Sequence, residues 1–236
     1  MIEAQFWVGL FQIISIDILL GGDNAVVIAL ACRDLPEKLR GRAMIWGMIG
    51  AVLIRLVLIF FALELLKVPY LEIAAAFLLF WIGVNLLGSG DCAAEREIKS
   101  NDSLVSAVRT IIVADVVMSI DNIIGVAGAA RDNMPLIVLG ISISVPVILW
   151  GSGLVLKVMD RFPSTILMGA ALIGWIAGDM MVMDAGLKGW VKANAPGLSW
   201  GSPVLFALAT VLVGKWRASK AACIDPAEND SGKGGL

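Results

Sequence analysis

The chain has 236 residues, of which 59% are hydrophobic and 16% charged, whereas an ordinary soluble domain is roughly 45–50% hydrophobic and about 25% charged. The formal net charge of −2 excludes the strongly basic surface of a nucleic-acid-binding protein. The chain contains no histidine, which excludes histidine-ligated zinc sites and Ser-His-Asp hydrolases. An apolar excess of this size requires a lipid solvent, so we expect an integral membrane protein.

Seven apolar segments follow one another along the chain, and only short polar stretches separate them. Each is long enough to span a membrane, which takes about 20 mostly apolar residues. We therefore predict an all-α protein with a single seven-helix membrane domain over residues 1–217. A disordered cytoplasmic tail, rich in small and charged residues, is expected over 218–236. The predicted spans are 7–31, 43–66, 70–89, 105–130, 135–157, 164–183 and 201–217.

Lysine and arginine are distributed unevenly between the two ends of these spans. Thirteen lie on one side and four on the other, and Arg55 lies inside the second span. The side with more positive charge is expected to face the cytoplasm. This places the chain in the cell inner (plasma) membrane as a multi-pass protein, with its N-terminus outside and its C-terminus in the cytoplasm. Four tryptophans at span ends are expected to be interfacial anchors: Trp7, Trp46, Trp200 and Trp216.

An internal repeat links the first and fourth spans. Residues 17–34 (DILLGGDNAVVIALACRD) and 115–132 (DVVMSIDNIIGVAGAARD) are identical at seven of eighteen positions without a gap. Three spans separate the two copies, so the second copy runs through the membrane in the opposite direction. We predict an inverted 3+3 repeat, with repeat one over 5–90 and repeat two over 104–184, plus a seventh helix over 201–217. Transporters commonly use this plan, with a substrate site near the midplane at the repeat interface.

The shared positions include acidic residues near the middle of both spans. An aspartate at the centre of a membrane helix costs about 2.5–3.5 kcal/mol on insertion scales, so it must face the bundle interior. There it can pair, ligate a cation, carry a proton, or simply hold helices together through hydrogen bonds. Carboxylate and amide oxygens suit Mg²⁺, Ca²⁺ and Mn²⁺. The six candidate metal-binding residues are Asp17, Asp23, Asn24, Asp115, Asp121 and Asn122.

Helix geometry adds a condition to this site. Asp17 and Asn24 are seven residues apart and share one helix face, whereas Asp23 lies about 120° away in a regular helix. Unwinding at Gly21-Gly22 would bring all three together, but the matching stretch of the fourth span has no glycine. Met118 could add a thioether ligand or simply pack in the core. Arg55 is interpreted as a buried counter-ion for a carboxylate, with a gating role as the alternative.

The pairing of GGDNAVVIAL near the N-terminus with SIDNIIGVAGAARD in the second half resembles the TerC family of integral membrane proteins, named after tellurium-resistance TerC and placed near the LysE-type exporters. The resemblance covers roughly residues 5–217. It implies export of metal ions, above all Mn²⁺, and some members are linked to tellurite resistance or pH response. The family's acidic positions fall on the six candidate residues named above.

We therefore expect a secondary transporter that exports a divalent cation in exchange for protons, and Mn²⁺ is the favoured candidate for that cation. The metal would be a substrate, and no permanent cofactor is expected. The chain lacks a Walker motif. The alternatives are Ca²⁺/H⁺ or other cation exchange, and a non-transporting membrane scaffold for tellurite or metal resistance. An intramembrane enzyme is disfavoured by the missing histidine and GxSxG motif. The expected partners are the lipid bilayer, the metal ion and a possible second copy of the chain.

Overall fold

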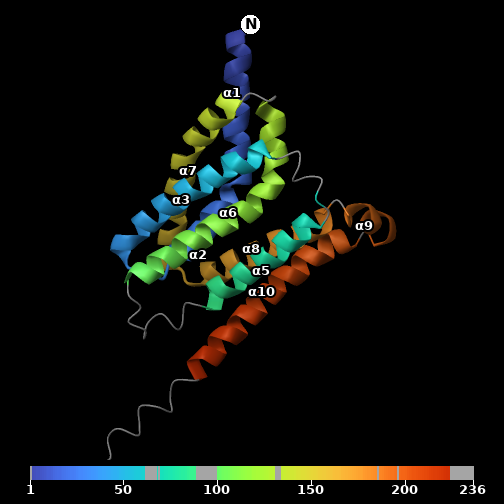
Figure 1. The fold of residues 1–236 in the computed structure, drawn as a ribbon. Coiled ribbons are helices and arrows are strands. Elements are labelled where there is room, and N and C mark those ends of the chain that lie inside the picture. The colour runs from blue at the N-terminus through green and yellow to red at the C-terminus, as the bar shows by residue number, and fades with distance from the viewer. Residues whose placement is uncertain are drawn as a thin grey trace, which may run out of the picture.

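The computed structural model is a bundle of helices without strands in its described part (Figure 1). The backbone is described for residues 2–61, 68, 70–88, 100–130, 134–184, 186–195 and 197–223. Within these ranges, the side chains of 2–5, 20, 100–102, 121–130, 134 and 220–223 lie outside the description. The helices are α1 (Ile2–Leu20), α2 (Gly22–Cys32), α3 (Glu37–Phe60), α5 (Leu71–Gly88), α6 (Ser100–Ala130), α7 (Met134–Arg161), α8 (Ser164–Met183), α9 (Lys188–Asn194) and α10 (Leu198–Cys223).

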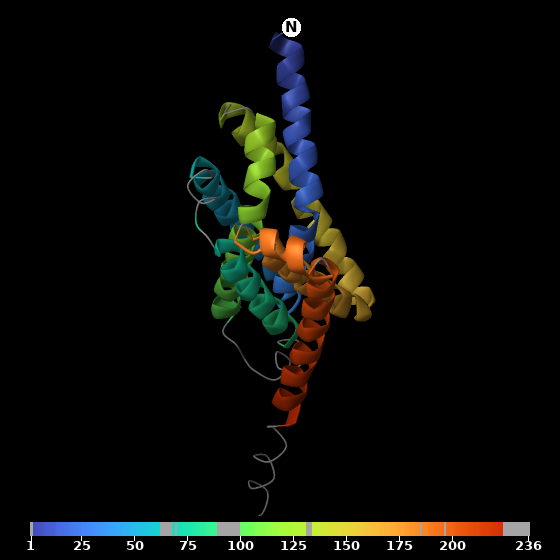
Figure 2. The ribbon, with the colours of Figure 1, turned by 90° about the vertical axis from the view of Figure 1, so that its right-hand side faces the viewer.

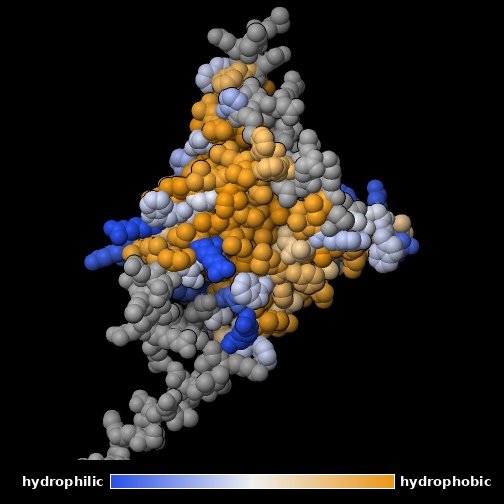
Figure 3. All heavy atoms as spheres, in the orientation of Figure 1, coloured by the Kyte–Doolittle hydropathy of each residue, from blue (hydrophilic) through white to orange (hydrophobic). Residues whose placement is uncertain are grey.

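The described helices match the predicted membrane spans. Six are long and apolar enough to cross a bilayer, and α1 and α2 together make a seventh if the bent pair counts as one span. Large apolar side chains face outward, among them Phe11 at 71% exposed and Trp150 at 74%. Figure 3 shows an apolar surface over the middle of the visible face, with most hydrophilic atoms toward its margins. An exposed apolar surface of this extent is unfavourable in water, so the outer surface of the bundle is suited to contact with lipid.

The two helices that carry the repeated motif differ in their backbone. The chain breaks between α1 and α2 at Gly21, and the two helices meet at an angle of 45°. The bend falls at the glycine pair that the sequence indicated for unwinding, although the Gly21 N–H still donates to the Asp17 carbonyl at 2.8 Å. In contrast, α6 remains helical from Ser100 to Ala130, although its ribbon changes direction along its length (Figure 1). Without glycine, the second motif keeps its helical hydrogen bonds.

Helix packing follows the inverted repeat in a reciprocal way. The second span, α3, packs against the fourth, α6, while the fifth, α7, packs against the first, α1. In the same manner α5 contacts α6, and α2 contacts α8. Figure 2, seen from the side, shows α1 rising above the rest of the bundle and α10 descending below it. The motif helices thus lie at the interface of the two halves, where the sequence predicts the site. The exact repeat boundaries stay a prediction.

The seventh span packs closely on the third and sixth. α10 runs along α8 and α5, and glycines let the backbones approach. A Cβ atom on Gly178 would lie 2.5 Å from the Ser202 carbonyl oxygen, and one on Gly214 would lie 2.7 Å from a Leu87 methyl carbon. Small residues at helix interfaces are the usual means of close packing in membranes.

Some boundaries differ from those predicted. The short helix α9 lies between the sixth and seventh spans, where no helix was expected. α10 continues to Cys223, past residue 217 where the tail was expected to begin, because the alanine-rich segment at its end favours a helix. The remainder of the predicted tail, 224–236, lies outside the described residues. The four tryptophans predicted as interfacial anchors are all exposed, between 58% and 74%.

Candidate functional site

An arginine and two aspartates from three helices meet in the middle of the bundle. Arg55 of α3 donates through Nη1 to Asp17 Oδ1 of α1 at 2.6 Å and through Nη2 to Asp115 Oδ1 of α6. Arg55 is 5% exposed, Asp17 3% and Asp115 6%. The interpretation of Arg55 as a buried counter-ion is therefore confirmed. With one positive and two negative groups, the cluster carries a formal charge of −1.

Neutral side chains complete the hydrogen bonding of both carboxylates. Ser144 of α7 donates its hydroxyl to Asp17 Oδ2, and Ser119 of α6 donates to Asp115 Oδ2 at 3.2 Å. Asn24 of α2 donates Nδ2 to Asp115 Oδ1 at 3.3 Å. Each of the four carboxylate oxygens thus has a donor. This is what buried charges in a low-dielectric interior require.

Two oxygen-bearing groups near this cluster, the Asn24 amide oxygen and the Asp23 carboxylate, are not paired with Arg55 in the described part of the chain. The Oδ1 atom of Asn24 is buried and has no hydrogen-bond partner among the described residues. Asp23 is partly buried, and its Oδ1 accepts the backbone N–H of Asn24 at 2.8 Å at the start of α2. The break at Gly21 positions both residues, because it turns α2 away from the axis of α1. An unpartnered buried amide oxygen next to a carboxylate is a chemically suitable beginning of a cation site.

The structure brings together part of the predicted metal-binding set. Asp17, Asn24 and Asp115 share the network around Arg55, and Asp23 lies next to Asn24 in the chain. The side chains of Asp121 and Asn122 lie outside the described residues. In the part of the chain that the structure describes, no three acidic or thiol side chains are grouped closely enough to hold a metal. The complete cage therefore stays a prediction.

Sequence reasoning did not find the serines that hold the carboxylates. Ser144 is fully buried and Ser119 is 1% exposed. Ser119 was visible as the only hydroxyl inside the second motif, but nothing in the spacing connected Ser144 to Asp17, which lies more than a hundred residues earlier. Met118, for which the sequence leaves a thioether-ligand role open, is 3% exposed and packs in the large apolar cluster.

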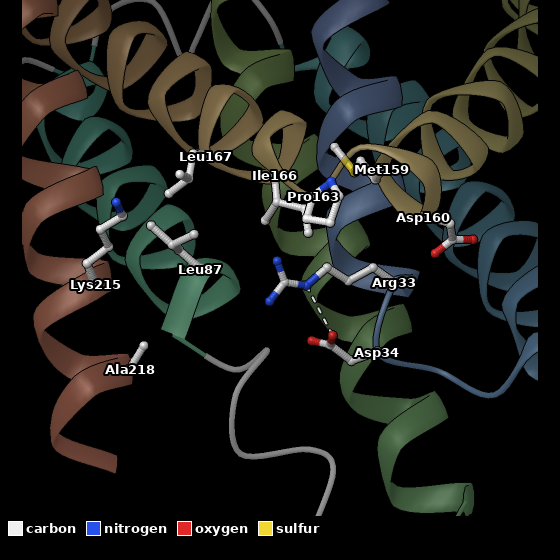
Figure 4. Close-up of a pocket in the computed structure, with 10 residues that line it drawn as sticks. All are labelled: Arg33, Asp34, Leu87, Met159, Asp160, Pro163, Ile166, Leu167, Lys215 and Ala218. Atoms are coloured by element: carbon white, nitrogen blue, oxygen red, sulfur yellow. Dashed lines mark hydrogen bonds and ion pairs between the residues drawn. The ribbon is translucent and has the colours of Figure 1, made fainter. Parts of the chain in front are cut away.

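A separate pocket opens at the end of the bundle where α2 ends. It has a volume of about 350 Å³ and is lined by residues of several helices, as Figure 4 shows. Arg33 points into it and pairs with Asp34 at 3.0 Å, and Lys215 of α10 lies across from them. None of the six predicted metal-binding residues lines the pocket.

Arg40 closes the same end of the bundle. It pairs with Asp160 of α7 at 2.7 Å and donates to the backbone carbonyls of Arg33 and Leu35. Arg33, Arg40 and Lys215, three of the thirteen basic residues predicted for one side of the membrane, thus lie at one end of the structure. The contact with the Arg33 carbonyl also caps the C-terminal end of α2.

Comparison with known proteins agrees with this architecture. Residues 2–222 match the integral membrane protein TerC family. The chain is 42% identical over 186 residues to the uncharacterized membrane protein YjbE of Bacillus subtilis (strain 168), covering 79% of this chain and 84% of that protein. It is 25% identical over 179 residues to the uncharacterized membrane protein YceF of the same organism, covering 72% and 69%.

A UPF0053 protein of Haemophilus influenzae is 26% identical over 189 residues, covering 72% of this chain and 79% of that protein. No solved structure matches the chain significantly. The family match includes both motif helices and the Arg55-bearing α3, and it ends one residue before the end of α10. This multi-pass integral membrane protein belongs to the TerC family.

Proposed function

We propose that the chain is a secondary transporter that exports a divalent metal cation from the cytoplasm, with Mn²⁺ as the favoured candidate. The observation that carries this proposal is the meeting of the two motif copies in the bundle interior. There Asn24 from the first motif donates to Asp115 from the second, at the boundary between the halves. Buried carboxylates are costly, so their concentration between inverted repeats supports a cation pathway.

The chemistry of the available ligands supports a hard cation. The site offers carboxylate and amide oxygens, including the unpartnered Oδ1 of Asn24 and the carboxylate of Asp23. Oxygen ligands favour Mn²⁺, Mg²⁺ and Ca²⁺ over soft metals. Asp121 and Asn122 complete the proposed set by repeat symmetry. The metal is the substrate, and the proposal assigns the chain neither an enzymatic reaction nor a permanent cofactor.

Protons are the proposed counter-ion. Carboxylates that ligate a metal must be ionised, so metal and protons compete for the same groups. Asp23 makes none of the described ion pairs with Arg55, which leaves its carboxylate for this exchange. We expect Mn²⁺ binding to weaken as the solution is acidified and to release protons into a weakly buffered detergent solution. Binding that is constant across the acidic range and releases no protons would leave the membrane potential as the driving force.

Uptake of metal into proteoliposomes tests the function directly. The wild type should move Mn²⁺, and Asp23→Asn and Asp121→Asn should abolish this flux while the protein still inserts. Asp160→Asn is the matched control, because Asp160 lies at the exposed end of α7. A panel with Ca²⁺ and Mg²⁺ separates manganese transport from calcium exchange. A folded protein that moves none of these ions would be a scaffold.

Reporter fusions test the proposed orientation in the plasma membrane. A reporter after Lys38 should be cytoplasmic, and one within residues 188–199 should be external, because lysine and arginine are concentrated at the Lys38 end. Reporters on the same side of the membrane would contradict both the orientation and the odd number of spans between the repeats.

A further inference from the structure

All three side-chain nitrogens of Arg55 donate hydrogen bonds within the site. Nη1 and Nη2 donate to Asp17 and Asp115, and Nε donates to the Ser119 hydroxyl at 3.1 Å. The planar fork therefore lies between two carboxylates that belong to opposite halves of the bundle. A guanidinium is the side chain best suited to bridge two carboxylates in this way, since its donors are fixed in one plane.

The carboxylates need a cation between them. Two ionised aspartates facing each other in a membrane interior repel, because their low-dielectric surroundings screen the charges little. Removing one partner of a buried ion pair is strongly unfavourable because the other charge is then left uncompensated. In this structure the cation that satisfies Asp17 and Asp115 is Arg55 itself.

The same oxygens are those that a metal ion would use. Asp17 Oδ1 and Asp115 Oδ1 accept from the guanidinium, and their second oxygens accept from Ser144 and Ser119. A metal can ligate the first pair of oxygens only when Arg55 releases them. The neighbouring Asn24 Oδ1 has no described partner, so the site keeps an oxygen that the guanidinium does not occupy.

We propose that Arg55 is an intramolecular substitute for the transported cation, an inference that rests on the proposed transport function. In the metal-free carrier, Arg55 holds Asp17 and Asp115 and lowers the formal charge of the empty site from −2 to −1, so the empty carrier can return across the membrane. When a divalent cation enters, it displaces the guanidinium from the carboxylate oxygens. Arg55 is thus a positioning residue that competes with the metal.

This role has a kinetic signature that a purely structural role lacks. Without the guanidinium, the loaded carrier still has a cation between its carboxylates, so exchange of metal for metal continues. The empty carrier, however, has two uncompensated charges, so its return is slow and net transport falls. Metal binding also becomes tighter, because the internal competitor is gone.

The experiment compares net uptake and exchange of radioactive Mn²⁺ in proteoliposomes. Net uptake is measured into metal-free vesicles, and exchange into vesicles preloaded with unlabelled Mn²⁺. The variants are Arg55→Gln and Arg55→Lys; the second keeps the positive charge but replaces the fork with one ammonium group. Arg42→Gln is the matched control, an exposed arginine on the same helix. Titration calorimetry in detergent gives Mn²⁺ affinity.

For Arg55→Gln we expect the ratio of net uptake to exchange to fall about tenfold and Mn²⁺ to bind about tenfold more tightly, the equivalent of losing a competing interaction of about 1.4 kcal/mol. Arg55→Lys keeps the positive charge, so it should lie between Arg55→Gln and the wild type in both measurements. Arg42→Gln should match the wild type. Equal losses of both fluxes with unchanged or weaker binding would overturn the inference and leave Arg55 as a structural ion pair.

The wild type provides a test that does not depend on how the variants fold. If Arg55 compensates the empty site, wild-type net uptake should run at a rate comparable to exchange. Wild-type exchange without net uptake would overturn the inference while preserving the transport function. Absence of both fluxes in the wild type would instead overturn the proposed function.

Discussion

Replacing Gly21 with alanine should disturb the break that places the first motif. A Cβ atom at this position would lie 2.5 Å from the backbone oxygen of Asp17, well inside the 3.4 Å at which ordinary van der Waals contact begins. It would also lie 3.1 Å from the terminal methyl of Ile148, which can move. The carbonyl cannot move without changing the end of α1, because it accepts the Gly21 N–H at 2.8 Å. Overpacking of this kind costs about 1–3 kcal/mol.

Gly22 is the matched control, because a Cβ atom there meets nothing within 4 Å. Thermal unfolding in detergent, followed by the loss of the monodisperse peak in size-exclusion chromatography, should show Gly21→Ala melting lower by about 2–12 °C, given about 2–4 °C per kcal/mol in a chain of this size. Gly22→Ala should match the wild type or exceed it, since alanine favours a helix over glycine. Equal melting temperatures for the two variants, or a more stable Gly21→Ala, would refute the steric reasoning.

Two further pairs of variants test packing at and away from the site. Ser144→Ala should lower the free energy of unfolding by about 1–3 kcal/mol, because a buried oxygen of Asp17 loses its donor. Ser152 lies on the same helix, and its hydroxyl donates to the backbone carbonyl of Ile148. Ser152→Ala should therefore cost much less in the same thermal assay. Gly178→Ala should loosen α8 from α10, because the added Cβ would lie 2.5 Å from a backbone oxygen. Gly201→Ala is the control, because its methyl group would lie in open space. Equal stabilities of the two variants in chemical denaturation would contradict the close packing.

The sequence was sufficient for the membrane spans and for the place of the break between α1 and α2, but not for the short helix α9. Runs of about 20 apolar residues specify spans because length and hydropathy are local properties. Two adjacent glycines marked the break because only that stretch of the motif lacks side chains to support a regular helix. The continuity of α6 follows from the same rule, since its motif has Ser119 and no glycine.

The simultaneous pairing of Arg55 with both carboxylates was not predictable from the spacing of residues in the sequence. The sequence placed Asp17 and Asp115 at matching positions, but whether they face a metal or an arginine depends on how α3 packs between them. Arg55 reaches both carboxylates only because α3 lies against α6 and near α1, which is a property of the tertiary structure. Ser144 was missed for the same reason. Neither residue had a local pattern that linked it to the motif.

The close contacts of α10 separate a rigid group of helices from the helices that hold the charged cluster. α5 and α8 are the last spans of the two repeats, and α10 packs against both through glycines whose neighbours leave no room for a side chain. Interdigitated backbones resist sliding, because any shift in register brings side chains into the space that only glycine leaves free. The three helices therefore form a rigid frame that joins the halves. In the proposed transport cycle, movement is then left to α1, α2, α3, α6 and α7, which hold the charged cluster.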